Sequence, residues 1–132
     1  MRPPPELTAG QDGPPRTIGP ITQTDIVRFA GAGGDFNPLH HDPEFAAAAG
    51  FSTVISMGQF QAGLLGSWLS DWVGIEHIRS LQVRFVAPLV LGDTVTIGGT
   101  VTGVDAGVAT LELQVTKDDG PVLTGTATTR SQ

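Results

Sequence analysis

Cysteine is absent from this sequence, and its absence excludes several kinds of chemistry. Disulfides, thiolate nucleophiles and cysteine-ligated zinc or iron–sulfur sites all need a residue that the chain does not have. Basic residues are also scarce, with 7 Lys and Arg against 13 Asp and Glu and a formal net charge of −6. Because binding to nucleic acid needs a basic face, we expect no nucleic-acid partner.

Long apolar runs are missing as well. No segment approaches the ~20 apolar residues of a membrane-spanning helix, and the first five residues, Met-Arg-Pro-Pro-Pro, lack the apolar core of a signal peptide. The sequence therefore predicts a cytoplasmic protein with no membrane span. A chain of 132 residues is long enough for one domain with its own core and too short for two.

The first 20 residues are rich in Pro and Gly, and Leu7 and Ile18 are their main apolar side chains. This composition is typical of an extended arm that contributes one short edge strand. We therefore divide the chain into an arm over residues 1–20 and a single domain over residues 21–132.

The segment 22–30 predicts a short helix. Thr22 is followed three residues later by Asp25, the pattern of a reciprocal N-terminal cap, and apolar residues follow at helical spacing. A second short helix is predicted further on, with Asp42 as its N-cap and Pro43 in its first turn. The two helices bracket a loop that carries the candidate chemistry.

A third helix of about 16 residues is the most apolar segment of the chain. Ser56 and Gln59 have the form of a capping box at its start. Apolar residues then recur at intervals of three and four: Phe60, Leu64, Leu65, Trp68, Leu69, Trp72 and Val73. Since small residues fill most of the remaining surface, we expect a core helix that is covered nearly all round.

From Glu76 onward the hydrophobic period changes from helical to twofold. Apolar and polar residues alternate over 81–85, 95–101 and 109–115, and a last strand ends near Thr129. Turn residues between the last three strands predict an antiparallel meander. A sheet with one apolar face and an apolar helix predict an α+β fold in which the sheet wraps the helix.

The segment 33–43 reads Gly-Gly-Asp-Phe-Asn-Pro-Leu-His-His-Asp-Pro. It places a carboxylate, Asp35, and an imidazole, His40, on a loop that Pro38 prevents from forming a continuous helix. A stiff loop can direct both groups at one bound water, as general acid–base chemistry requires. The same residues also suit a loop without chemistry, in which Asp35 and Asn37 form turns and His40 packs beside them.

A metal site at the His-His-Asp sequence, residues 40–42, is a weaker alternative. Adjacent side chains in an extended segment point apart, and His77 is the only other histidine in the chain. We therefore expect no metal.

The loop and its surroundings resemble a known family. Residues 25–30, the Gly-Asp-Phe-Asn-Pro-Leu-His-His-Asp of residues 34–42, a glycine at the start of the long helix and the Val-Arg-Phe of residues 83–85 resemble the MaoC-like dehydratases. These are the (R)-specific enoyl-CoA hydratases of the hot-dog fold. The resemblance covers about residues 18–129, and Asp-x-Asn-Pro-Leu-His is its most specific part. It implies a long central helix wrapped by a curved antiparallel sheet, with two such units paired through their sheets.

The resemblance also implies a reaction, the hydration of trans-2-enoyl thioesters of CoA or acyl-carrier protein to (R)-3-hydroxyacyl thioesters, or the reverse dehydration. Asp35 and His40 would hold the water, with the roles of acid and base undivided between them. The backbone amide of Gly58 would polarise the thioester carbonyl, and Asn37 would orient the loop or the water. Many members have a histidine before this glycine, whereas Met57 here would make the pocket entrance apolar. The CoA thioester is the substrate, and no separate cofactor is expected.

Two other functions fit the same sequence. One is a subunit without complete activity, which binds a different MaoC-like chain and contributes half of a site. The other is a hot-dog thioesterase, which is disfavoured because hydrolysis has no use for this loop. We also expect at least a dimer, homomeric or heteromeric, because Leu- and Val-rich positions on the outer face of the sheet would leave apolar surface to bury.

Overall fold

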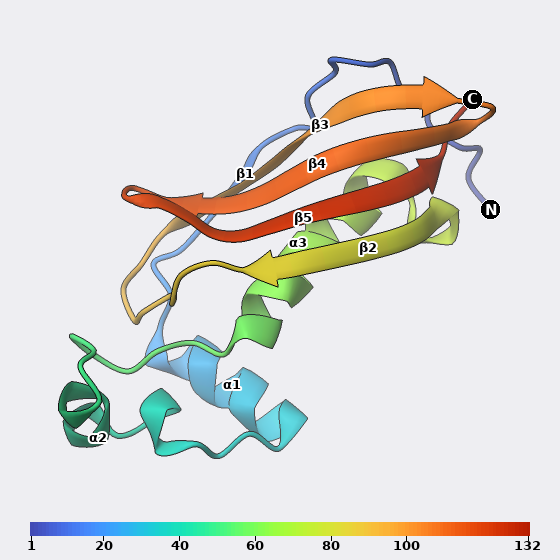
Figure 1. Ribbon diagram of the computed structural model, residues 1–132. Helices are drawn as coiled ribbons and strands as arrows, with labels where there is room; N and C mark the ends of the chain where they lie inside the picture. Colours follow the sequence, from blue (N-terminus) through green and yellow to red (C-terminus); the bar gives the residue numbers. More distant parts are fainter.

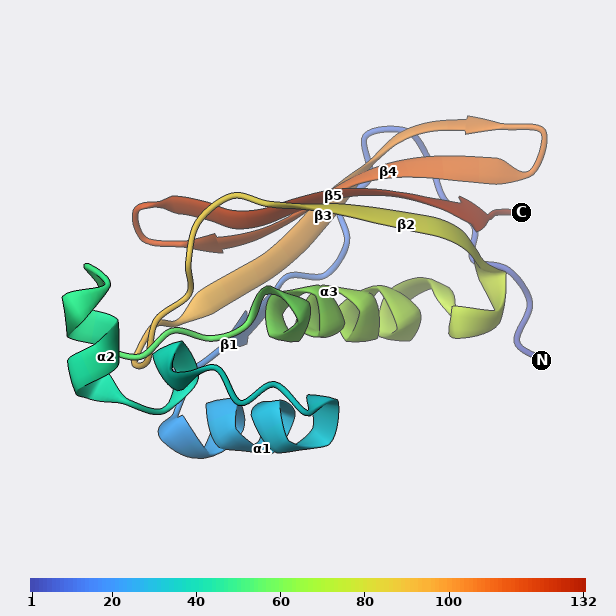
Figure 2. The same ribbon diagram turned by 60° about the horizontal axis from the view of Figure 1, so that its bottom comes forward.

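Helix α3, Gly58–Val73, is the central element of the computed structural model, which describes residues 1–132. It is 16 residues long and lies under a five-stranded antiparallel sheet (Figure 1). Leu65, Trp68 and Leu69 on its inner face are almost completely buried. Figure 2 shows the sheet curving over this helix, so the predicted α+β arrangement of a sheet around an apolar helix is confirmed.

The strand order of the sheet is β1-β3-β4-β5-β2. The strands in chain order are β1 (Arg16–Ile18), β2 (Ile78–Phe85), β3 (Val95–Asp105), β4 (Val108–Lys117) and β5 (Gly120–Arg130). The last three form the predicted meander, and β1 is the predicted edge strand. In β4, buried and exposed residues alternate over Val108–Val115, which turns Leu111, Leu113 and Val115 toward the core.

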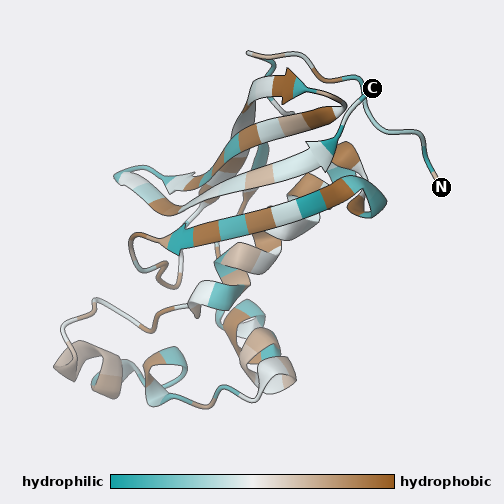
Figure 3. Ribbon diagram, turned by 45° about the vertical axis from the view of Figure 1, so that its right-hand side comes forward, coloured by the Kyte–Doolittle hydropathy of each residue, from teal (hydrophilic) through white to brown (hydrophobic).

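The outer face of the sheet is polar, which corrects the expectation of Leu- and Val-rich positions there. Threonines together with Glu112 and Gln114 occupy it, because the apolar residues of β4 after Val108 are turned inward. Two half-exposed valines lie at the β3–β4 turn. The other exposed apolar side chains of the sheet region lie along and just beyond the free edge strand β2, where hydropathy alternates (Figure 3): Leu81, Phe85 and Val86.

The N-terminal arm packs against the same core as the rest of the chain. Leu7 is buried, and the indole N–H of Trp68 donates to the carbonyl oxygen of Pro14 at 2.7 Å. The boundary near residue 20 therefore marks a change from an extended segment to a helix, while the hydrophobic core is shared.

Both predicted caps of the short helices are present. In α1 (Gln23–Gly33), the Thr22 hydroxyl accepts from the Asp25 amide at 3.1 Å, and the Asp25 carboxylate accepts from the Thr22 amide at 2.9 Å. The hydrogen bond from the Thr22 backbone amide, and then the one from the Thr22 hydroxyl, lower the pKa of the Asp25 carboxyl. In α2 (Pro43–Ala48), the Asp42 carboxylate accepts from the first amides of the helix.

The start of α3 differs from the prediction. Met57 is its N-cap residue and makes no side-chain cap hydrogen bond. Ser56 lies one residue before this position, so its hydroxyl cannot cap the first turn and instead donates to the side-chain oxygen of Gln61 at 3.0 Å. The first amides of α3 are therefore left without a side-chain acceptor.

One face of α3 is also exposed in the isolated chain. Gln59, Gly63 and Ser67, spaced four residues apart, are open to solvent, so the expectation of a helix covered nearly all round is wrong for a single copy. No helix has the length and apolarity needed to cross a bilayer. The cytoplasmic location expected from the sequence stays a prediction.

Candidate active site

The C-terminal end of α1 positions Asp35. Gly34 ends the helix in the left-handed region, at φ 72°, and the Asp35 amide donates back to the carbonyl oxygen of Ala30 at 3.0 Å. The Asp35 side chain is 46% exposed, and one of its oxygens accepts from the Asn37 amide at 3.3 Å. The turn thus holds a carboxylate open to solvent with one oxygen fixed by the loop.

His40 lies in the short 3-10 helix η1, Pro38–His40, and its ring is nearly buried. Nδ1 lies 2.8 Å from the carbonyl oxygen of Ile55, and Nε2 lies 3.3 Å from Oδ2 of Asp35. Since a carbonyl oxygen only accepts, Nδ1 carries a proton and Nε2 is the nitrogen that can exchange one with Asp35. The two residues singled out in the loop therefore form a carboxylate–imidazole pair.

Asn37 has a local role in this loop. Its side-chain oxygen accepts from the Leu39 amide at 3.0 Å and so caps η1. Of its two predicted roles, the turn-forming one is observed. His41 and Asp42 are also engaged locally, since Nε2 of His41 lies 3.4 Å from the carbonyl oxygen of Phe36 and Asp42 caps α2. No cluster of three or more side chains that could hold a metal ion is found.

A cavity of about 700 Å³ opens beside the N-terminal end of α3. Its wall combines one carboxylate with apolar side chains and the first turn of the helix, and includes Phe29, Asp35, Met57, Gly58, Phe85 and Ala87. His40 does not line this cavity. It lies behind Asp35, in a smaller hollow of about 250 Å³ that Asp35 also borders. Asp35 is therefore the group through which the pair faces Gly58.

Gly58 is the first residue of α3, where backbone amides have no acceptor within the helix. Its N–H is bonded to no other backbone group, and no side chain caps it. A Cβ atom at this position would lie 2.8 Å from Cε1 of Phe85, so any other residue here would displace the Phe85 ring. The free amide stands at the positive end of the helix dipole and can donate to a ligand oxygen.

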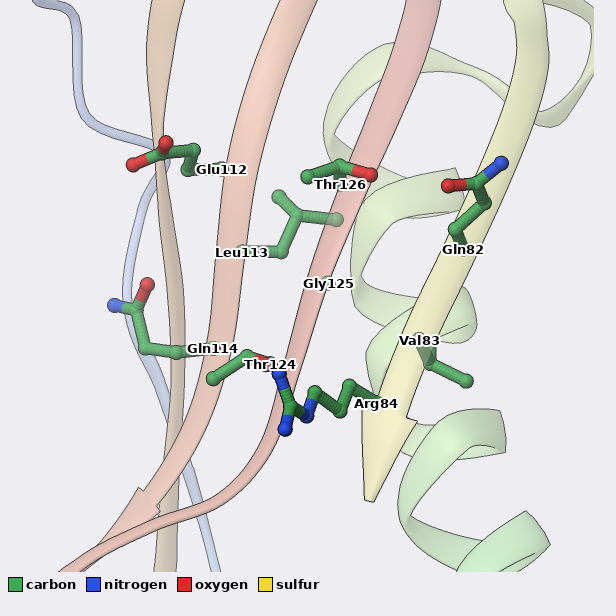
Figure 4. Close-up of a pocket in the computed structure, with 9 residues that line it drawn as sticks. All are labelled: Gln82, Val83, Arg84, Glu112, Leu113, Gln114, Thr124, Gly125 and Thr126. Carbon is green, nitrogen blue, oxygen red and sulfur yellow. The ribbon is translucent and has the colours of Figure 1, made fainter. Parts of the chain in front are cut away.

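A second hollow, of about 470 Å³, lies on the outer face of the sheet. Figure 4 shows its side chains on three neighbouring strands, with α3 behind them: Gln82, Arg84, Glu112, Gln114, Thr124 and Thr126. No helix N-terminus and no residue of the Asp35–His40 pair borders this hollow. The cavity at α3 is bordered by a free helix amide and by Asp35, the carboxylate paired with His40, and is therefore the candidate active site.

Phe85 and Gln61 also line this cavity, and neither was predicted from the sequence to belong to a site. Phe85 was assigned only to a strand, although its ring lies over Gly58 and is 53% exposed. Gln61 was passed over within the apolar helix, although it is buried and lines the cavity. The available signal for Gln61 was its position, a polar residue four before Leu65 on a face that is otherwise apolar.

Comparison with known proteins decides the family. Residues 8–120 match the sequence model of the MaoC like domain. The chain belongs to the MaoC-like family. The (R)-specific enoyl-CoA hydratase of Aeromonas caviae is 37% identical to it over 110 residues, which cover 78% of this chain and 81% of that enzyme. The 3-oxo-4,17-pregnadiene-20-carboxyl-CoA hydratase beta subunit of Mycobacterium tuberculosis is 35% identical over 91 residues, 68% of this chain and 70% of that subunit.

Another relative matches over a smaller part of its length. The (R)-specific enoyl-CoA hydratase of Rhodospirillum rubrum is 36% identical over 86 residues, 63% of this chain, and the match spans 59% of that protein. The relatives are named as hydratases or dehydratases, and this confirms the predicted enzyme class, a hydratase or dehydratase of acyl thioesters, at the level of the MaoC-like family.

Solved structures confirm the hot-dog fold. The ChsH1–ChsH2 complex from Mycobacterium tuberculosis contains a chain with a TM-score of 0.85 and 29% identity, and the match covers 95% of this chain and 98% of that one. The (R)-hydratase from A. caviae involved in PHA biosynthesis gives a TM-score of 0.82 at 28% identity and covers 96% and 98%.

Proposed function

We propose that this MaoC-like chain adds water to trans-2-enoyl-CoA thioesters to form (R)-3-hydroxyacyl-CoA, and catalyses the reverse dehydration. One observation carries the proposal: Asp35, whose Oδ2 lies 3.3 Å from Nε2 of His40, borders the same cavity as the free amide of Gly58. Addition of water to an enoyl thioester needs a proton acceptor and a donor for the oxyanion that develops. These two groups supply both.

The proposed reaction begins with a water held at Asp35. As its oxygen bonds to C3, the water loses a proton to the Asp35–His40 pair, and the electrons of the C2=C3 bond move onto the thioester oxygen. The Gly58 N–H, at the positive end of α3, stabilises that charge. A proton returned by the pair to C2 completes the addition, so no other reactant is needed. The Nδ1 bond to Ile55 holds the His40 ring in place throughout.

The walls of the cavity suit an acyl chain. Phe29, Met57 and Phe85 would enclose the apolar part of the substrate near the reacting carbons. The CoA group enters as part of the substrate, and the proposal involves no other cofactor.

Hydration of crotonyl-CoA by the purified chain tests this proposal directly. We expect the absorbance of the enoyl thioester to fall and the product to be oxidised by a dehydrogenase specific for (3R)-hydroxyacyl-CoA. The same assay with enoyl thioesters of longer or ring-bearing acids, and of acyl-carrier protein, would define the substrate range. Inactivity with every enoyl thioester would refute the proposal, and release of free CoA would favour a thioesterase.

A second candidate is a hydratase subunit that works only with another MaoC-like chain. Two uncovered surfaces favour it: the free edge of β2, with Leu81, Phe85 and Val86 exposed, and the exposed face of α3. The matched chain in the ChsH1–ChsH2 complex supports a partner of the same fold. Light scattering should give at least twice the 13.7 kDa of one chain if copies pair. A monomer that gains activity only with a second MaoC-like chain would identify the subunit.

A further inference from the structure

Gln61 is a polar side chain on the buried face of an apolar helix. It is only 3% exposed, and it borders the candidate active-site cavity next to Gly58. Burial of a carboxamide without hydrogen-bond partners costs free energy, so such groups in native proteins are normally paired. The partners of Gln61 therefore indicate what it does.

One end of the Gln61 carboxamide, the oxygen, is hydrogen-bonded within the protein. Its Oε1 accepts from the hydroxyl of Ser56 at 3.0 Å, and this is the only hydrogen bond that the side chain makes to the protein. Ser56 is itself buried, so the bond holds the oxygen end of the amide group toward Ser56. The Nε2 atom has no protein acceptor and is not among the enclosed unpaired atoms, so it opens onto the cavity with two N–H groups to donate.

The position of Gln61 on the helix brings these donors close to the Gly58 amide. Residues three apart lie on the same side of an α-helix. Helical side chains also lean toward the N-terminus, so the Gln61 amide is directed back toward the first turn of α3. Ser56, which immediately precedes the N-cap residue, is bonded to it there.

The chemistry of the cavity indicates which ligand group these donors fit. Asp35 is the only charged residue in its wall, and its negative charge disfavours an anionic group of the ligand beside it. Two neutral donors side by side suit a neutral carbonyl oxygen that gains negative charge during the reaction.

We propose that the Gln61 carboxamide donates a second hydrogen bond to the thioester carbonyl oxygen of the substrate, beside the Gly58 amide, and that Ser56 orients it. The inference rests on the proposed hydratase function. Gln61 is thus a catalytic residue, and Ser56 is a positioning residue.

Turnover of crotonyl-CoA by Gln61→Met tests the role of Gln61, since methionine has a similar volume and no donor. Loss of one oxyanion donor lowers kcat by about 10²–10³-fold, and we expect a loss in this range. Ser56→Ala should lower kcat by about fivefold, because it removes one neutral hydrogen bond that orients the amide. Gln114→Met, which changes a glutamine on the outer face of the sheet, is the matched control and should leave turnover unchanged.

Gln61→Glu provides a second variant that keeps the shape and the bond from Ser56. An ionised carboxylate offers no donor, so turnover should fall near neutral pH. The ratio of Gln61→Glu turnover to wild-type turnover should rise as the pH is lowered, because the protonated carboxyl group can donate a hydrogen bond. A purely structural role for Gln61 predicts a ratio that does not change with pH.

Binding measurements separate this inference from the hydratase function itself. Calorimetry would compare butyryl-CoA with S-butyl-CoA, a thioether that lacks the carbonyl oxygen, and neither compound reacts. Wild-type protein should prefer butyryl-CoA, and this preference should be smaller in Gln61→Met, in which only the Gly58 amide donates to the carbonyl oxygen. If wild type hydrates no enoyl thioester, the proposed function fails while this comparison still tests Gln61. A folded Gln61→Met protein with unchanged turnover and preference would overturn the inference.

Discussion

The two ends of α3 differ in their hydrogen-bond partners: the C-terminal end is bonded to the N-terminal arm, and the N-terminal end has no side-chain cap. At the C-terminal end, the Ser70 carbonyl accepts from the Gly74 amide at 3.0 Å and from the Arg2 guanidinium at 3.2 Å. His77 in turn donates from Nε2 to the carbonyl of Arg2 at 2.8 Å, and Glu76 accepts the Arg2 amide at 3.1 Å. At the N-terminal end no side chain caps the helix, and a cavity lies beside it.

This difference indicates which end of α3 is available to bind a ligand. A helix leaves four carbonyls free at one end and four amides free at the other, and partners at both ends stabilise it. Here Arg2 of the N-terminal arm bonds to the C-terminal end, which we call the closed end, whereas the first amides of the N-terminal end, the open end, have no side-chain acceptor. A Ser or Asp at position 57 would stabilise the helix by capping it, and Met57 does not. We therefore infer that the amides at the open end bind the ligand.

The largest effect is expected from the proton-transfer pair at the open end. Asp35→Asn and His40→Gln should each lower hydration by roughly 10²–10⁴-fold with little change in melting temperature, because each removes a proton-transfer partner at similar volume. The double variant should be little worse than the poorer single variant, since both residues serve one water. Turnover and thermal unfolding measured on the same samples check this. Near-normal turnover of Asp35→Asn would mean that Asp35 only forms a turn.

Gly58→Ala should lower turnover by about 10–100-fold, because a misplacement of about 1 Å in the bound thioester is costly. The new methyl group would meet the Phe85 ring, which would have to move. Phe85→Ala and the double variant, Gly58→Ala with Phe85→Ala, distinguish displacement of that ring from obstruction of the oxyanion site. If the double variant recovers the turnover of Phe85→Ala, the ring is the cause and the amide is not obstructed.

At the closed end, Arg2→Ala should change stability and leave turnover unchanged. It removes a hydrogen bond to the Ser70 carbonyl and an exposed ion pair, so we expect a loss of about 1 kcal/mol in the free energy of unfolding. Urea unfolding followed by tryptophan fluorescence measures this loss. Reduced turnover in a stable Arg2→Ala protein would contradict the division between the two ends.

The smallest effect is a pH dependence at Glu76. Hydrogen bonds from its own backbone amide and then from that of Arg2 lower the pKa of this carboxyl below its ordinary value of 4.5. A lowered pKa in the folded state adds stability that is present above the unfolded value and disappears as the pH falls through the folded value. Glu76→Gln should therefore be less stable than wild type near neutral pH, and the difference should vanish once the pH is below the lowered pKa of Glu76 in the folded state. A difference that persists there would exclude the charge as its cause.

Local sequence patterns predicted most of the helices and strands and the loop of the candidate site. Cap patterns at Thr22 and Asp42 and the twofold alternation after Glu76 depend on contacts between near neighbours, which a sequence encodes directly. The Asp-x-Asn-Pro-Leu-His segment is equally local, because Pro38 and the turn at Gly34 shape it within a few residues. For this reason Asp35 and His40 could be selected before their distance was known.

The way in which distant segments meet at the cavity could be seen only in the folded chain. The Phe85 ring over Gly58 and the place of His40 behind Asp35 depend on the curvature of the sheet and the path of the loop. The bond from Ser56 to Gln61 followed from the helix starting at Gly58, two residues after the predicted cap. Helical spacing alone shows which side chains share a face. It does not show which of them has a cavity in front of it, because a cavity is formed by segments that the sequence keeps far apart.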